Sequence, residues 1–385
     1  MTSSTLCEDV LLKIADTVGG SDLETLLSLS LSCRTLQQAC RPWTYRTIHI
    51  NPSHPPLDVA GFCRRHPNIV RKATTLSFQN VVFEYGVLRM LLDTLGSVVK
   101  LKFRSMSMEV EDGAPALLGR IKIVTMDQCD FSRLALRLIL GNSCIEEWSL
   151  TSYAGLHRHG ESDSPTSPLP LARLRGLSLD LSNFQWSTPR YYPIIQSPLN
   201  ELVLLLERAR SLVTFEVVFT LDIVLYVNRI IEQNVNTLRS LSIWQEAFDE
   251  YDLNSSWVQP LLLSKCAMLA DLIVHCFHVN IQGVAATLSG VRSSVKRMEF
   301  HVYCIRGALW RGYLNNEDIG FRAFDISISK LASTKLVLHI RLEGERQLRL
   351  VKDWVEGFLA CSIKGGMLSV EWTAATDCHM YQEYV

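Results

Sequence analysis

Residues 73–150 repeat one short apolar motif four times, as ATTLSF (73–78), VVKLKF (98–103), IKIVTM (121–126) and IEEWSL (145–150). The central residues of these segments follow one another at intervals of 25, 23 and 24 residues. Related segments continue along the chain as LRGLSL (174–179), LNELVL (199–204), LRSLSI (238–243), LADLIV (269–274), VKRMEF (295–300), TKLVLH (334–339) and MLSVEW (367–372). A recurrence of this period is typical of repeat proteins, in which each unit contributes a strand and buries its apolar face against its neighbours.

The segments between these predicted strands have the pattern of return helices. Apolar residues recur at helical spacing in residues 87–95, 131–140, 223–235 and 348–359. Such intervals are long enough for right-handed crossovers between parallel strands. The sequence therefore predicts an α/β fold over residues 51–385, a strand/helix solenoid with a curved parallel sheet. It resembles irregular leucine-rich repeats, and Cys129 matches the Asn or Cys that follows a strand in that family.

Two points in this long domain leave alternatives open. A non-repeating α/β domain would also explain alternating strands and helices. The register is uncertain between Met298 and Leu336, where a further strand could lie. By contrast, Leu212–Ile231 is predicted to be a strand followed by a buried helix, because charged residues such as Glu216 and Arg229 interrupt it and argue against a membrane span.

The first fifty residues have a different pattern, three short helical stretches that end on a Pro-Trp step and an extended segment: LCEDVLLKIADTVGGSDLETLLSLSLSCRTLQQACRPWTYRTIHI (6–50). Thr5 with Glu8 and Ser21 with Glu24 fit capping boxes at two helix starts. One apolar stripe consists of Val10, Leu11, Ile14, Ala15 and Val18, and a second consists of Leu26, Leu29, Cys33, Leu36 and Cys40. Pro42 is predicted to end the last helix. Three such short helices carry more apolar surface than they can bury together, which favours a partner helix.

This head resembles an F-box, the short module that binds a Skp-type adaptor in cullin-based ubiquitin ligases. The matching residues are Leu6, Glu8, Leu11, Ile14, Asp22, Leu23, Leu26, Leu29, Cys33, Arg34, Leu36, Trp43 and Tyr45. The resemblance is strongest to fungal members, in which the module runs straight into a long C-terminal domain. One departure is Cys7, which stands where many members have Pro.

The resemblance implies two domains, an adaptor-binding head (1–50) and a solenoid (51–385). It also implies a function, that of substrate-recognition subunit of an SCF (Skp-cullin-F-box) ubiquitin ligase. The residues expected to bind the adaptor are Leu6, Leu11, Ile14, Leu26, Leu29, Cys33, Arg34 and Trp43. The partners would be the adaptor, through it a cullin, and an unknown target protein held by the solenoid for proteasomal degradation. The chain itself would catalyse nothing and need no cofactor. The alternative is an interaction scaffold outside any ligase, with the head as its N-terminal cap.

Composition and charge narrow the class of protein further. The net charge is −1, which gives no basic footprint for nucleic acid or for a membrane surface. The 11 cysteines form no CxxC pair and are typical of buried thiols in a reducing compartment. Glu8 and Asp9 stand where a secretory signal would need basic residues. We therefore expect a cytoplasmic or nuclear protein.

A polar segment, HRHGESDSPTSPLP (157–170), is predicted to be a flexible loop between two strands. Its two Ser-Pro steps, at Ser164 and Ser167, could be phosphorylation sites, although an unmodified loop is the simpler interpretation. The loop contains three residues at every second position, as metal ligands on one face of a strand would be: His157, His159 and Glu161. A loop this polar favours a solvated cluster instead.

Enzyme motifs are missing from the sequence, which has no Walker loop, no GxGxxG after a strand, no HExxH and no GxSxG. Cys276 lies near His278, and Cys304 lies near His301. A nucleophilic pair also needs hydrogen-bond reach and an orienting group. Buried thiols beside sheet histidines are the simpler interpretation.

One row of polar and aromatic residues is the candidate target-binding surface. Counting three residues on from the centre of each motif gives Trp244, His275, His301 and His339, after Asp127, Thr151 and Asp180 on earlier strands. Neighbouring strands are about 4.8 Å apart, so aligned residues would form a ladder on the open face. Three histidines could hold zinc, but we expect no metal because no acidic partners accompany them. Chance placement of exposed residues is an equally good explanation.

Overall fold

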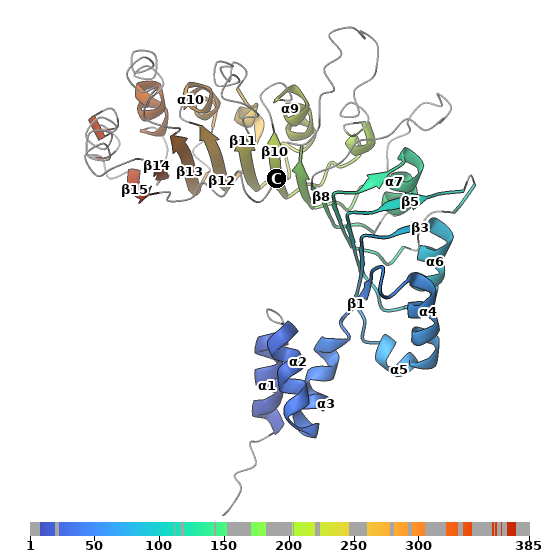
Figure 1. The fold of residues 1–385 in the computed structure, drawn as a ribbon. Helices are drawn as coiled ribbons and strands as arrows, with labels where there is room; N and C mark the ends of the chain where they lie inside the picture. Colours follow the sequence, from blue (N-terminus) through green and yellow to red (C-terminus); the bar gives the residue numbers. More distant parts are fainter. Residues whose placement is uncertain are drawn as a thin grey trace, which may run out of the picture. The chain divides into compact units, whose positions relative to one another are not determined.

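The computed structural model of the chain (Figure 1) describes residues 8–19, 23–111, 113–115, 117, 119–141, 144–151, 171–181, 202, 204–219, 224–245, 260–277, 281–291, 295–304, 321–329, 334–340, 356–357, 359, 363 and 368–374. The chain divides into two compact units, Met1–Trp148 with Tyr153–Ser162, and Ser149–Ser152 with Asp163–Val385. Several expectations lie outside the described residues: the caps at Thr5 and Ser21, adaptor residue Leu6, the loop 157–170 and most of the helix expected over 348–359.

Three helices open the first unit: α1 (Glu8–Gly19), α2 (Leu23–Ser32) and α3 (Arg34–Thr44). They pack around a small core of buried Ala15, Leu26, Ala39 and Cys40, with Val18, Leu29 and Trp43 against it. These residues recur every three or four positions, so each helix turns one narrow stripe inward. We call these three helices the head.

The expectation that Pro42 ends the last of these helices is wrong, because α3 continues to Thr44. Proline removes one backbone donor and crowds the preceding turn, which is most costly inside a helix. Here it falls in the final turn, so the one bond that is lost is that to the Gln38 carbonyl, four residues earlier. The Thr44 hydroxyl donates to the Cys40 carbonyl at 3.1 Å in the same turn.

A parallel sheet follows the head, with strands β1 (Thr47–Ile50), β2 (Thr75–Gln79), β4 (Lys100–Arg104), β6 (Ile123–Asp127) and the beginning of β8 (Glu147–Thr151). The strands lie in sequence order, and Leu76 pairs with Leu101, which pairs with Val124. The extended segment that ends the helical pattern is the first strand of this sheet, because β1 pairs with β2.

Each unit of this sheet repeats the same turn. Asn80, Ser105 and Gln128 directly follow β2, β4 and β6, and have positive φ angles of 53, 48 and 50°. Non-glycine residues rarely adopt such angles, so three in equivalent positions mark a structural repeat. After the turn come three short strands that form a second parallel sheet: β3 (Val82–Glu84), β5 (Ser107–Glu109) and β7 (Asp130–Phe131).

Helices and aromatic residues fill the space behind these strands. The helices are α4 (Pro56–Arg65), α5 (Pro67–Val70), α6 (Tyr85–Thr94) and α7 (Arg133–Leu140), so the predictions over 87–95 and 131–140 are confirmed. Phe78 stacks on Phe103 with ring centroids 5.4 Å apart, and Phe103 meets Phe131 edge-on at 5.4 Å. Cys129 is fully buried, and its thiol donates to the Asp127 carbonyl at 3.2 Å. One core therefore runs through successive repeats.

The second unit continues the strand order. Its elements are the end of β8, then β9 (Gly176–Asp180), β10 (Thr214–Phe219), α9 (Val224–Gln233), β11 (Ser240–Gln245), the 3-10 turn η3 (Leu263–Lys265), β12 (Asp271–Phe277), α10 (Ile281–Ser289), β13 (Arg297–Cys304), β14 (Thr334–Ile340) and β15 (Leu368–Ala374). Between β9 and β15 the neighbouring strands that the structure describes pair in parallel, and Figure 1 shows α9 and α10 on one side of the strands. The predicted alternation of strands and helices with a parallel sheet is confirmed, and it is compatible with a leucine-rich-repeat-like solenoid.

Two strand assignments differ from expectation in this unit. The motif LNELVL was predicted to be a strand, but residues 202 and 204–206 are helical. The strand lies instead at β10, within the segment predicted to be a strand followed by a helix. Local apolar spacing alone cannot separate a short strand from a helical turn. β13 pairs directly with β14, so no further strand is inserted between them in the sheet, and residues 305–320 and 330–333 lie outside the described residues.

Within the described ranges, no helix has the length and apolar character needed to cross a membrane.

Candidate functional site

Side-chain alternation separates the two faces of the sheet in the second unit. Along β11, Leu241, Ile243 and Gln245 are buried, whereas Ser240, Ser242 and Trp244 are partly exposed. Successive side chains of a strand point to opposite faces, so the partly exposed set defines the face away from the buried core. We call it the open face.

Three aromatic side chains stack across the open face. Trp244 pairs in register with His275, and His275 pairs with His301. The ring centroids of Trp244 and His275 are 3.6 Å apart with 13° between the planes, and those of His275 and His301 are 4.1 Å apart with 6° between them. The predicted alignment of these three residues is confirmed. We call them the ring stack.

The fourth predicted member, His339, does not belong to the row. His301 pairs with Val337, and His339 pairs with Tyr303, two residues further along the strand. The motif centre in β14 was therefore misplaced by two residues. A slip of two residues preserves the alternation of faces, so the sequence pattern could not reveal it. Asp180 does lie in the row, because it pairs with Val218, which pairs with Trp244.

Charged residues flank the ring stack on β13. Arg297 donates to Glu299 at 2.6 Å, and the other Glu299 oxygen lies 3.1 Å from His301 Nε2. The hydrogen bond from Arg297 is the main cause that lowers the pKa of the Glu299 carboxyl, against a smaller opposing effect of desolvation. Glu299 is therefore held as a carboxylate that orients the His301 ring.

The ring stack is not arranged to hold a metal ion. Parallel stacked imidazoles direct their nitrogen lone pairs side by side, whereas tetrahedral zinc needs ligands that converge. Among the residues that the structure describes, no three His, Cys, Asp or Glu side chains form a metal-binding group. The open face instead offers ring edges and a carboxylate–guanidinium pair to a partner.

Cys276 is unsuited to nucleophilic chemistry. Its side chain lies on the buried face of β12, and burial raises the pKa of its thiol to about 12. The reactive species is the thiolate, which is scarce at neutral pH under these conditions. His278 and the Cys304 side chain lie outside the described residues.

Replacement of His275 by Ala is expected to lower the free energy of unfolding by about 1–3 kcal/mol, because the ring is only 8% exposed and stacks on two others. Urea denaturation followed by circular dichroism measures this loss. Ser242→Ala, on the same face of the neighbouring strand, is the control and should change stability by less than about 0.5 kcal/mol. An equal, small effect of both changes would show that the ring stack contributes nothing to stability.

The predicted adaptor-binding residues occupy different environments in the head. Leu26 is fully buried in the head core, and Leu29 and Trp43 pack against that core. Leu11 is half-buried, whereas Ile14, Cys33 and Arg34 are exposed. Leu26 and Trp43 therefore hold the head together; Arg46 also lies over the Trp43 ring, 4.9 Å from its centroid.

Three exposed apolar residues of the head were not among those predicted to bind the adaptor. Val10 on α1 and Leu27 on α2 are exposed, and Leu31 on α2 is 86% exposed. Leu27 and Leu31 are four residues apart, so they lie on one side of the helix. That spacing was visible in the sequence, but it was hidden among the other leucines of α2.

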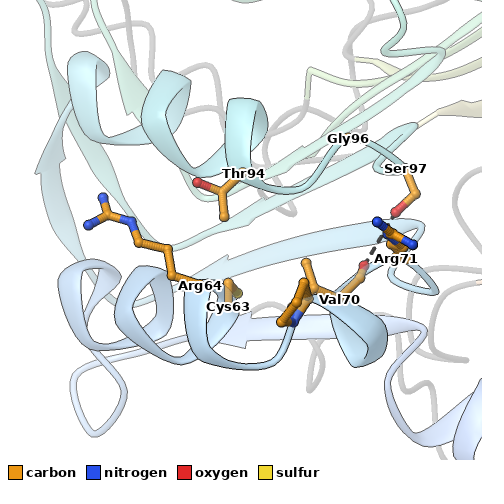
Figure 2. A pocket seen from close by; sticks show the side chains of 8 residues that line it. Cys63, Arg64, Val70, Arg71, Thr94, Gly96 and Ser97 are labelled. Atoms are coloured by element: carbon orange, nitrogen blue, oxygen red, sulfur yellow. Dashed lines mark hydrogen bonds between the residues drawn. The ribbon is translucent and has the colours of Figure 1, made fainter.

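A cavity of about 520 Å³ lies in the first unit, between α4, α5 and the end of α6 (Figure 2). Its lining consists of Cys63, Arg64, Pro67, Val70, Arg71, Thr94, Gly96 and Ser97, with Arg64 and Arg71 at opposite ends in Figure 2. The hydroxyl of Ser97, one of these lining residues, donates to the Ala73 carbonyl at 2.7 Å. Burial raises the pKa of the Cys63 thiol, which disfavours the thiolate that a nucleophile needs.

The comparisons with known proteins name no family. The chain matches no protein-family model, and no curated protein matches its sequence. Among solved structures it is similar to the crystal structure of a TLR13–ssRNA13 complex, at 12% identity and a TM-score of 0.36. That match covers 86% of this chain and 36% of the other, so the chain spans about a third of its length. At these values the likeness adds nothing to the strand order and burial described above.

Proposed function

We propose that this chain is the substrate-recognition subunit of an SCF-type ubiquitin ligase. In this proposal the head binds a Skp-type adaptor, and the repeat domain holds a target protein. The chain contributes by positioning the target, and other subunits transfer ubiquitin. The parallel strand order and the repeated turns of the first unit support the coarser description, a repeat-type interaction scaffold.

The observation that carries the adaptor proposal is the exposed apolar surface of the head. The head has a core of its own, yet Val10, Ile14, Leu27 and Leu31 remain exposed on α1 and α2. Burying a leucine side chain contributes about 1.5–3 kcal/mol, so these positions would contribute strongly to binding an apolar partner helix. Leu31, as the most exposed of them, should contribute most.

The ring stack is the proposed contact for the target. Trp244 offers a large rigid surface with few rotatable bonds, which is why Trp is frequent at binding hot spots. Glu299 and Arg297, beside His301 at the other end of the ring stack, add a polar rim on β13. His275 and His301 support Trp244 from one side, so we assign them to positioning Trp244 more than to direct contact.

One observation favours the alternative, in which the head is only the cap of a scaffold outside any ligase. The chain passes from α3 to β1 within a few residues, and the Arg46 carbonyl accepts hydrogen bonds from the backbone N–H groups of Thr74 and Thr75. The head is thereby joined closely to the first strands. A cap, however, has no need for exposed leucines.

Co-expression of the full chain with a Skp-type adaptor tests the proposal. The adaptor should co-purify with the wild-type chain, and Leu27→Asp/Leu31→Asp should reduce its recovery at least about tenfold, because an unpaired charge would enter the interface. Leu57→Asp is the matched control, since Leu57 is 68% exposed on α4, outside the head. It should leave recovery unchanged. Failure of the wild-type chain to retain the adaptor would favour the cap.

A further inference from the structure

The first unit carries a group of cations on the open side of its sheet. Along β4, Leu101 and Phe103 are buried, so Lys100, Lys102 and Arg104 lie on the other face. In register, His49 of β1 pairs with Ser77 of β2, which pairs with Lys102. Lys102, Arg104 and His49 are exposed, and Lys100 is half-buried. We call His49, Lys100 and Lys102 the basic face.

Few acidic groups balance these cations. Arg104 forms an ion pair with Asp127 at 3.4 Å, so its charge is balanced within the chain. The charge of Glu147 raises the pKa of Lys100, but this effect is outweighed by desolvation and by the charges of Lys102 and Arg46, which lower it. Within the described part of the chain, Lys100 and Lys102 form no ion pair. Lys122 differs, since it is paired with Glu146 at 3.0 Å.

The cations of the basic face also repel one another. Desolvation and then the Lys102 charge lower the pKa of Lys100, and Arg46 adds to this effect. Desolvation and Lys102 likewise lower the pKa of His49. An anion bound between these groups would relieve the repulsion, and a surface with charges of one sign attracts partners of the opposite sign.

We propose that the basic face binds an acidic segment of a partner protein, in extended conformation. Lys100 and Lys102 are two residues apart on one strand, about 6.6 Å, which matches the spacing of alternate carboxylates along an extended peptide. His49 lies two strands away, about 10 Å, so the charges are spread too widely to converge on one phosphate. The basic face consists of two lysines and a histidine, so it has no guanidinium group, whose planar fork favours a phosphoryl group.

The acidic segment would belong to a protein partner, so its binding extends the proposed function of target recognition. It does not depend on adaptor binding, because the exposed leucines of the head and the basic face are different residues. A chain that failed to bind the adaptor could still bind the acidic segment, and the reverse also holds.

Fluorescence anisotropy with a labelled glutamate-rich peptide of about ten residues tests the inference on the full chain, in about 50 mM salt. The wild-type chain should bind the peptide saturably, and Lys100→Gln/Lys102→Gln should weaken binding at least about tenfold. Lys122→Gln/Lys265→Gln is the control of equal charge, because both lysines are paired, with Glu146 and Glu232. It should change the affinity by less than about twofold.

Three outcomes would overturn the inference. The first is that the glutamate-rich peptide does not bind the wild-type chain. The second is that both double variants weaken binding equally, which would point to net charge alone. The third is tighter binding of a phosphoserine peptide or a single-stranded RNA of equal length, which would assign the basic face to phosphate groups. Circular dichroism and size-exclusion chromatography confirm that each variant is folded.

Discussion

A chain that ends after Ser240 is expected to lose the cooperative fold of the second unit. The truncation removes most of β11 and all of β12–β15, so β10 loses its partner on one side. Phe215, Val217 and Phe219 of β10 are buried in the full chain, as are Val227 and Ile231 of α9. In a repeat array each unit buries its apolar face only against its neighbours, so these side chains would be exposed to water. An unpaired strand edge would add aggregation.

Size-exclusion chromatography and urea denaturation by circular dichroism measure this loss. The truncated chain should elute as an aggregate, or show a broad transition of reduced amplitude beside the sharper one of the full chain. A soluble fragment with a sigmoidal transition would contradict the repeat account, and would show that residues 51–385 contain independently folding domains.

Phe300→Ala is expected to cost about 3–5 kcal/mol of unfolding free energy. Phe300 of β13 is completely buried, and its ring meets that of Phe324 edge-on at 5.1 Å. Phe324 lies in the helical segment 321–328, so the pair joins the sheet to its helical layer. Removing the ring leaves a cavity that a packed core closes only partly.

Ile326→Ala is the matched control, since Ile326 is 59% exposed in the same helical segment. It should change stability by less than about 0.5 kcal/mol. Urea denaturation gives the stability change of each variant, as a shift of the midpoint at an unchanged m-value. Similar losses for the two variants would mean that this helical segment does not cover the sheet.

The strands could be predicted from the sequence because apolar and polar residues alternate along them, as their side chains are alternately buried and exposed. In Leu76, Leu101, Val124 and Trp148 the motif centre coincides with a buried strand position. The helices α6, α7 and α9 were predictable for the same reason, through their apolar spacing. The errors arose where the apolar period is ambiguous. The helical turn at 204–206 has the apolar content of a strand. On β14 the predicted register was wrong by two residues, and a shift of two residues leaves each side chain on the same face of the sheet.

The candidate surfaces were less predictable, because each depends on what the fold buries. Leu26 matches the F-box pattern, but it is buried in the core of the head, whereas Leu31 remains exposed. The ring stack was visible in the sequence as aligned Trp244, His275 and His301. The basic face was not, since it requires the pairing of β1 with β2, and residues 47–50 were not among the repeated motifs. Long-range register of this kind is set by tertiary packing and not by local sequence.

Calorimetric titration of a purified Skp-type adaptor into the full chain tests the central claim most directly. The exposed leucines of the head predict saturable one-to-one binding with a Kd of about 1 µM or lower. Binding should be lost in Leu27→Asp/Leu31→Asp and kept in Leu57→Asp. Absence of saturable heat with the folded wild-type chain, at about 100 µM of each protein, would contradict the assignment of the head to an adaptor.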